Sequence, residues 1–291
     1  MEPINSRQKI LNYPLTRILL GLLVCFIAFI IAQQLTGKIL DLTSLNKEYR
    51  NLIKGVAASV LVVATYRFFF EKYEKREISE FSCNGVGKYI LSGTLLGALL
   101  QSLTILVIFF AGSFEILSVN SISNTITPLA IAFSVAIFEE ILIRGIIFRI
   151  MEEKLGSYIS LLISAIIFGA LHLANPNSTL ISALCIAIEA GLLLGLAYIY
   201  TRNLWFPIAI HFAWNFMQSG IFGAITSGNE RTSSLLTTKI TGNPIITGGE
   251  FGPEGTIQAT IFCLLASLIL LQLSKNKLIK PYWKKQTTSI L

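Results

Sequence analysis

Long apolar segments separated by short polar connectors make up most of the chain. A transmembrane helix needs about 20 mostly apolar residues to cross a hydrocarbon core of ~30 Å, and eight segments reach or approach this length. They are residues 15–35, 51–70, 89–112, 126–150, 157–174, 178–201, 204–225 and 256–273. Runs such as residues 264–271 lack the alternation of membrane β-strands. The pattern therefore predicts an all-α, polytopic membrane protein with about eight transmembrane helices in one domain, residues 1–291.

The composition narrows the class of protein further. Only 13% of the residues are charged and 53% are hydrophobic, whereas a typical soluble domain carries about 25% charged residues. A cytosolic enzyme is therefore excluded. The net charge of +7 is spread over the connectors, which argues against a nucleic-acid partner. The cysteines lie far apart and exclude a disulfide framework or a thiolate metal site. They are Cys25, Cys83, Cys185 and Cys263.

The distribution of Lys and Arg predicts the orientation in the membrane. With eight spans, sixteen of these residues fall on the side of the N-terminus and six on the opposite side. Because basic connectors stay in the cytoplasm, we expect both termini there, in an integral protein of the bacterial plasma membrane. We interpret the first apolar segment as a retained helix rather than a cleaved signal, because it is long enough to cross.

Two local patterns bear on packing. The steps Gly93 to Gly97 and Gly191 to Gly195 place small residues one helical turn apart, which favours close approach of helices. Residues 226–255 form the only long polar connector and end in a glycine-rich stretch, residues 247–255. We expect an external flexible loop there, with a lid or a re-entrant turn as the alternative.

Several ionisable residues lie inside the predicted spans. They are Glu139, Glu140, Arg144, His172, Glu189 and His211. A charged side chain at membrane depth costs at least ~2.5–3.5 kcal/mol, so each of these residues needs a structural or functional reason. The two histidines are the only ones in the protein. For Glu189, which has no charged neighbour one turn away, we expect a supporting hydrogen bond rather than catalysis.

The fourth span contains an acid pair followed by an arginine. Residues four apart share a helix face, so Arg144 can neutralise Glu140. Glu139 lies on another face, roughly 140° away, and is less well paired. One carboxylate held ionised beside a second that is free suits proton transfer. The alternative is a structural ion pair with one acid that reaches towards the membrane surface.

Two further spans each carry a histidine within an i, i+4 pair. Phe168 can pack against His172, and His211 shares a face with Asn215. An imidazole and a carboxamide that point together can donate two hydrogen bonds to an oxyanion. The alternative is that the histidines are satisfied core residues. Counted along the helices, His172 lies deeper than Glu139 and His211, so helix tilt is needed to bring the three together.

These groups support two kinds of hydrolytic site. Glu139 with His172 could deprotonate water while His211 and Asn215 bind the oxyanion. Alternatively, Glu140, His172 and His211 could form the two-histidine, one-carboxylate set of a catalytic zinc ion. No Ser or Cys stands beside a motif histidine in the sequence, which disfavours covalent catalysis.

In this order, the motifs resemble those of the CAAX prenyl protease 2 family, also called the CPBP or Abi family of intramembrane peptidases. The motifs are Glu139-Glu140-x-x-x-Arg144, Phe168-x-x-x-His172 and His211-x-x-x-Asn215, within residues 126–218. The resemblance implies eight helices around an intramembrane cavity, with residues 126–218 (helices 4 to 7) as the catalytic core. It also implies a peptide or protein substrate, prenylated in eukaryotic members, and peptide maturation or bacteriocin self-immunity in many bacterial ones.

The resemblance further implies roles for individual residues. Glu139 and His172 would activate water, His211 and Asn215 would form the oxyanion hole, and Glu140 and Arg144 would support the site together with Phe168. Both a zinc-dependent and a metal-independent glutamate mechanism are argued for the family. The leading hypothesis is therefore an intramembrane endopeptidase. The alternatives are a non-catalytic immunity or scaffold protein and a proton-coupled transporter, the latter disfavoured because no matching pair of interrupted spans occurs.

Overall fold

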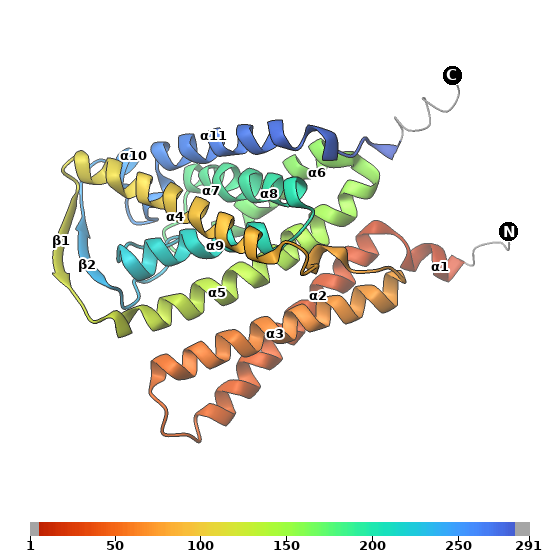
Figure 1. Ribbon diagram of the computed structural model, residues 1–291, viewed down its shortest axis with the longest axis horizontal. Helices are drawn as coiled ribbons and strands as arrows, with labels where there is room; N and C mark the ends of the chain where they lie inside the picture. Colours follow the sequence, from red (N-terminus) through yellow and green to blue (C-terminus); the bar gives the residue numbers. More distant parts are fainter. Residues whose placement is uncertain (1–5, 283–291) are drawn as a thin grey trace.

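The computed structural model describes residues 6–282, and the two chain ends, which we predict to be cytoplasmic, lie outside this range. Helices account for most of the described chain (Figure 1). The α-helices are α1 Ser6–Leu11, α2 Pro14–Leu40, α3 Lys47–Glu74, α4 Val86–Phe110, α5 Ile126–Glu140, α6 Arg149–Leu171, α7 Leu180–Ile186, α8 Leu193–Thr201, α9 Trp205–Asn215, α10 Pro244–Thr247 and α11 Ile257–Leu273. Three π-helical segments, η3 Ile141–Phe148, η5 Ala187–Leu192 and η6 Phe216–Ile221, continue α5, α7 and α9. Short 3₁₀ helices are η1 Ser79–Phe81, η2 Ile122–Thr125, η4 His172–Ala174, η7 Pro253–Gly255 and η8 Lys275–Lys277.

The helices confirm the all-α class and the polytopic membrane architecture. Within residues 6–282, five helices are long and apolar enough to cross a membrane, and α11 is a shorter apolar helix. The five are residues 14–40, 47–74, 86–110, 122–174 and 180–201. The fourth of them contains two of the predicted spans, residues 126–150 and 157–174, in one helical run. Gly156 divides this run, because its φ of 75° and ψ of 170° are not helical.

The glycine steps act as predicted at both helix contacts. A Cβ at Gly93 would lie 2.7 Å from the carbonyl oxygen of Phe206, and one at Gly97 would collide with the carbonyl oxygen of Ile210. The backbone of α4 therefore lies directly against α9. Likewise, Gly191 in η5 meets Ala165 of α6, where a Cβ would lie 2.8 Å from the alanine side chain. These contacts fix the helices that carry the histidines.

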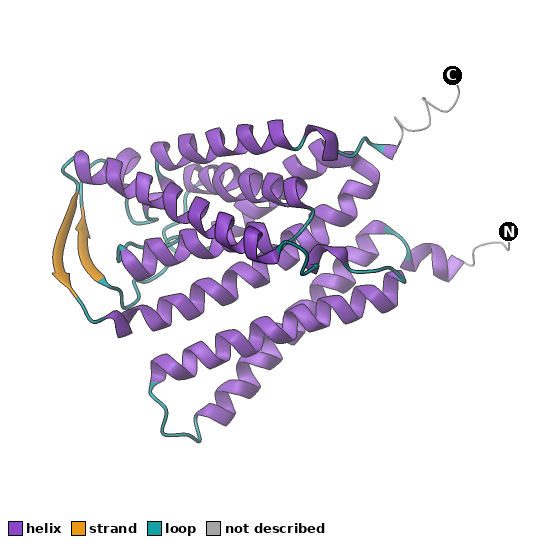
Figure 2. Cartoon of the chain, viewed as in Figure 1, coloured by secondary structure: helices purple, strands orange, loops and turns teal. Residues whose placement is uncertain are grey.

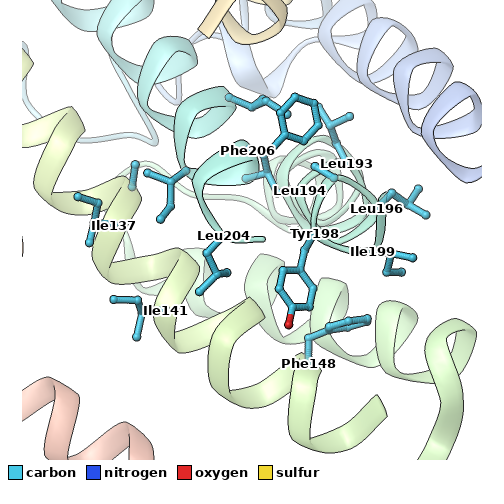
Figure 3. Close-up of a cluster of buried hydrophobic side chains, with 14 of the residues drawn as sticks. Ile137, Ile141, Phe148, Leu193, Leu194, Leu196, Tyr198, Ile199, Leu204 and Phe206 are labelled. Atoms are coloured by element: carbon cyan, nitrogen blue, oxygen red, sulfur yellow. The ribbon is translucent and has the colours of Figure 1, made fainter. Parts of the chain in front are cut away.

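A cluster of buried apolar side chains fills the space between η3, α8 and α9. Figure 3 shows part of this cluster, in which Phe148 and Tyr198 face each other across the gap between η3 and α8. The rings meet edge to face, with their centroids 5.7 Å apart. Leu204 and Ile141 are fully buried in the same cluster. The packing gives the motif-bearing helices a rigid common core, while α2 and α3 form a hairpin along one edge of the bundle (Figure 1).

The segment at residues 226–255 corrects the expectation of a flexible loop. It contains strand β2, Leu236–Ile240, which pairs antiparallel with β1, Phe114–Val119, at one end of the bundle (Figure 2). After α10, residues 248–255 turn inward, and Phe251 is buried beside the end of α6. Strands were not predicted, because β1 is a short piece of a connector and pairs with a partner more than 100 residues away. The segment is a packed cap over one end of the bundle.

Candidate active site

The acid pair ends α5, and the arginine follows one turn later in η3. Glu140 and Arg144 are both buried, and Arg144 Nη1 donates to Glu140 Oε1 over 2.6 Å. Arg144 Nη2 donates to the backbone carbonyl of Ala190 over 2.7 Å, and the guanidinium stacks 4.8 Å from the centre of the Phe168 ring. The pairing predicted from the i, i+4 spacing is present. It also connects the acid pair to η5 and to α6.

His211 lies between the two acids. Its Nδ1 is 3.1 Å from Glu140 Oε1, and its Nε2 is 3.9 Å from Glu139 Oε2. The two neighbouring carboxyl groups differ in environment, since the Glu139 side chain is 30% exposed and that of Glu140 is fully buried. Glu140 is therefore committed to Arg144 and His211. Glu139 remains accessible to solvent.

His172 stands at the end of α6, where its ring is oriented by a backbone group. Its Nδ1 lies 2.8 Å from the carbonyl oxygen of Phe168. Because a carbonyl can only accept, Nδ1 carries the hydrogen, and in the neutral ring Nε2 is left as an acceptor. The Phe168 ring packs against the imidazole with a centroid separation of 4.7 Å. This contact is the one that the spacing of the second motif predicts.

Four of the predicted site residues face one cavity of about 550 Å³. They are Glu139, His172, His211 and Asn215. Residues of α5 and of the cap, including Ser227, complete its walls. The difference in depth counted along the helices therefore does not keep these residues apart. Glu140, Arg144 and Phe168 lie outside the lining of this cavity and contact the residues that form it.

The sequence reasoning missed one acidic residue near this site. Glu254, in η7, is 2% exposed and lines a smaller chamber together with His172, His211 and Glu189. Burial raises the pKa of Glu254 above its usual value, although donors from Ser227 and Trp214 and the nearby His172 oppose the rise. Glu189 makes the supporting hydrogen bond expected of it, accepting from Thr260 Oγ1 over 2.6 Å. The only feature of the sequence that pointed to an unusual role for this segment was the set of glycines around Glu254.

The predicted zinc ligands do not form a metal site in this arrangement. Among residues 6–282, no group of three or more His, Cys, Asp or Glu side chains is placed to hold a metal ion. On this geometry we assign no metal ion to the set Glu140, His172 and His211. Zinc stays a prediction from the sequence, and no step below passes through a metal.

An accessible acid, two imidazoles and a carboxamide therefore surround one cavity. Residues 121–217, about one third of the chain, match the model of a family described as type II CAAX prenyl endopeptidase Rce1-like. Over these residues the match supports the resemblance predicted from the three motifs, and it lies close to the core predicted at residues 126–218. No curated protein and no solved structure matches the chain.

Proposed function

We propose that the protein is an intramembrane endopeptidase that hydrolyses a peptide bond of a peptide or protein substrate near the membrane surface. The observation that carries this proposal is the convergence of Glu139, His172, His211 and Asn215 on one cavity. The family match supports a proteolytic reaction over the same residues. A CAAX-type prenylated peptide is the first substrate to test, because the matched family is described by that activity.

In the proposed reaction, Glu139 is the base. It accepts one proton from a water molecule, and the acceptor Nε2 of His172 receives the second hydrogen of that water as a hydrogen bond. The water oxygen then attacks the carbonyl carbon of the substrate. The proton held by Glu139 passes to the leaving amine as the C–N bond breaks. Glu139 suits this role, since it is the acid of the pair that is not engaged by Arg144.

His211 and Asn215 would stabilise the negative charge on the carbonyl oxygen. They lie one helical turn apart on α9 and both face the cavity. In this mechanism His211 carries a hydrogen on each nitrogen, donating from Nδ1 to Glu140 and from Nε2 to the oxyanion. Glu140 and Arg144 then hold the ring in place. Preorganised donors of this kind are often the largest single contribution to catalysis.

The test compares the parent protein with Glu139→Gln and His172→Ala, purified in detergent and assayed with a fluorogenic prenylated CAAX peptide and its unprenylated counterpart. Loss of the general base is expected to lower kcat by about 10²–10⁴-fold without loss of folded protein. Glu115→Gln, on the exposed face of β1, is the matched control and is expected to cleave like the parent.

Two results would separate the proposal from its alternatives. Cleavage by Glu139→Gln at the parent rate would exclude Glu139 as the base. Protection of cells by a catalytically dead variant would favour the immunity or scaffold hypothesis. An unchanged rate in excess chelator is expected for the metal-free reaction, and a loss of activity that added zinc restores would instead assign a metal.

A further inference from the structure

A second, smaller chamber lies behind the catalytic histidines. It has a volume of about 40 Å³ and shares His172, His211, Asn215 and Ser227 with the large cavity. Its remaining walls come from α6, α7, η5, α8, α9 and the cap, and none of them comes from α5. The histidines thus form a partition, with the substrate cavity on the α5 side and the inner chamber on the η5 side.

The cap delivers Glu254 into this chamber through tight backbone turns. Gly252 has a φ of 111°, and a Cβ there would collide with the carbonyl oxygen of Ile225. Gly228 has a φ of 73° and its N–H donates to the carbonyl oxygen of Phe251 over 2.8 Å. Asn177, just beyond η4, donates to the carbonyl oxygen of Gly228 over 3.2 Å. These backbone turns and hydrogen bonds therefore fix the inward position of Glu254.

Two buried carboxyl groups line the chamber, and each has an oxygen that no protein group satisfies. Glu254 is 2% exposed and Glu189 is 4% exposed. Glu254 Oε1 and Glu189 Oε2 are buried and have no hydrogen-bond partner among the described residues. The other Glu189 oxygen is bonded to Thr260. Buried polar atoms normally have a protein or water partner, so these two oxygens indicate bound polar ligands.

The size of the chamber indicates what those ligands are. A cavity needs about 10–15 Å³ of this kind of volume to hold a water molecule, so about 40 Å³ accommodates about three or four waters. Among residues 6–282, no three His, Cys, Asp or Glu side chains are placed together so as to hold a metal ion, which favours water as the ligand. Polar oxygens on the walls distinguish this chamber from a dry apolar void.

We propose that Glu189 and Glu254 bind a small water cluster in the inner chamber, and that Glu254 is a positioning residue that keeps water beside His172 while substrate fills the large cavity. This inference rests on the proposed peptidase function. A peptide that enters the large cavity displaces water from it, whereas the chamber on the other side of the histidines stays hydrated. The cap is then part of the hydrolytic site as well as of its roof.

The test uses the full-length protein and the peptide assay described above. Glu254→Leu removes the water-binding oxygens, and Ala190→Leu fills the chamber from an apolar wall without touching Glu254. Each is expected to lower kcat about tenfold or more, as when a group that supports a functional histidine is lost, with KM within about twofold of the parent. Glu254→Gln retains polar oxygen and nitrogen atoms and is expected to keep at least half of kcat. Glu250→Leu, exposed in the same segment, is the control.

A merely structural role for Glu254 gives a different pattern. The Leu variant would then lose folded protein, while kcat for each folded molecule would stay at the parent value. That result, or a folded Ala190→Leu variant with the parent kcat, would overturn the proposal. If Glu254→Leu fails to fold, Ala190→Leu and Glu254→Gln decide the question. Failure of the peptidase function itself is recognised separately, since the parent would then not cleave or Glu139→Gln would cleave equally well.

Discussion

At the scale of single residues, the site depends on neighbouring side chains of one type that have different environments. Glu139 and Glu140 are adjacent in sequence, yet one is accessible and the other is fully buried in an ion pair. The two histidines also differ, because His172 is oriented by a backbone carbonyl and His211 by a carboxylate. The buried acid is thus held in an ion pair with Arg144, and the accessible acid is not bonded to the arginine.

Asn215 gives a prediction at this scale. Asn215→Ala removes one of the two proposed oxyanion donors and is expected to lower kcat by about 10²–10³-fold, with little change in KM, because the donor acts mainly in the transition state. Steady-state kinetics with the fluorogenic peptide measure both parameters. Asn84→Ala, in the exposed connector before α4, serves as the control. A rise in KM at unchanged kcat would assign Asn215 to substrate binding instead.

The sequence predicted the residues of the site better than their surroundings. The Glu140–Arg144 pair and the Phe168–His172 contact are local, so the i, i+4 spacing was sufficient to predict them. Glu254 was not found, because a glutamate in a polar connector is unremarkable. Its burial depends on the turns at Gly228 and Gly252, and on backbone groups that lie far away in the sequence.

At the scale of elements, π-helical segments adjoin the motifs. η3 follows the acid pair and contains Arg144, η5 contains Glu189, and η6 begins directly after Asn215. Such segments are rare and occur frequently at functional sites. The length of the apolar segments predicted the spans, but it could not predict where an α-helix changes to a π-helix, because both kinds of turn consist of the same apolar residues. The sequence also did not predict that the helical run continues through Gly156. The conformation at Gly156 depends on its packing against the backbone of Ile279 and Pro281, which lie far away in the sequence.

The contact between α4 and α9 gives a prediction about an element. Gly97→Val places a branched side chain against the carbonyl group of Ile210, one residue before His211. We expect the helices to separate and the free energy of unfolding to fall by about 1–3 kcal/mol, as in other overpacked sites, with loss of peptidase activity. Gly87→Ala, in the same helix with open space around it, is the matched control. Thermal unfolding in detergent tests both, and an unchanged midpoint for Gly97→Val would contradict the close contact.

At the scale of the whole molecule, a charged network joins the α2–α3 hairpin to the start of α6. Glu74 at the end of α3 accepts from Arg17 of α2 over 2.7 Å and from Arg149 of α6 over 2.9 Å. Arg76 donates to Glu74 over 2.6 Å and to Glu80 over 2.5 Å. The network lies at the end of the bundle opposite the two-stranded sheet (Figure 1). Positive charge was predicted at this end from the topology, but its pairing with buried acids was not, because the partners come from distant segments.

Glu80 makes this network sensitive to acid. Burial opposes ionisation of Glu80, but hydrogen bonds from Arg76 and Tyr66 outweigh it and hold the pKa of Glu80 below its usual value. A group with a lowered folded-state pKa stabilises the protein above its unfolded pKa, about 4.3 for Glu, and this stabilisation is lost as the pH falls through the folded value. The thermal unfolding midpoint in detergent is therefore expected to drop below about pH 4.3. In Glu80→Gln this part of the pH dependence should disappear, with a lower midpoint at pH 7. An equal acid-induced drop in both proteins would show that the network is not held by Glu80.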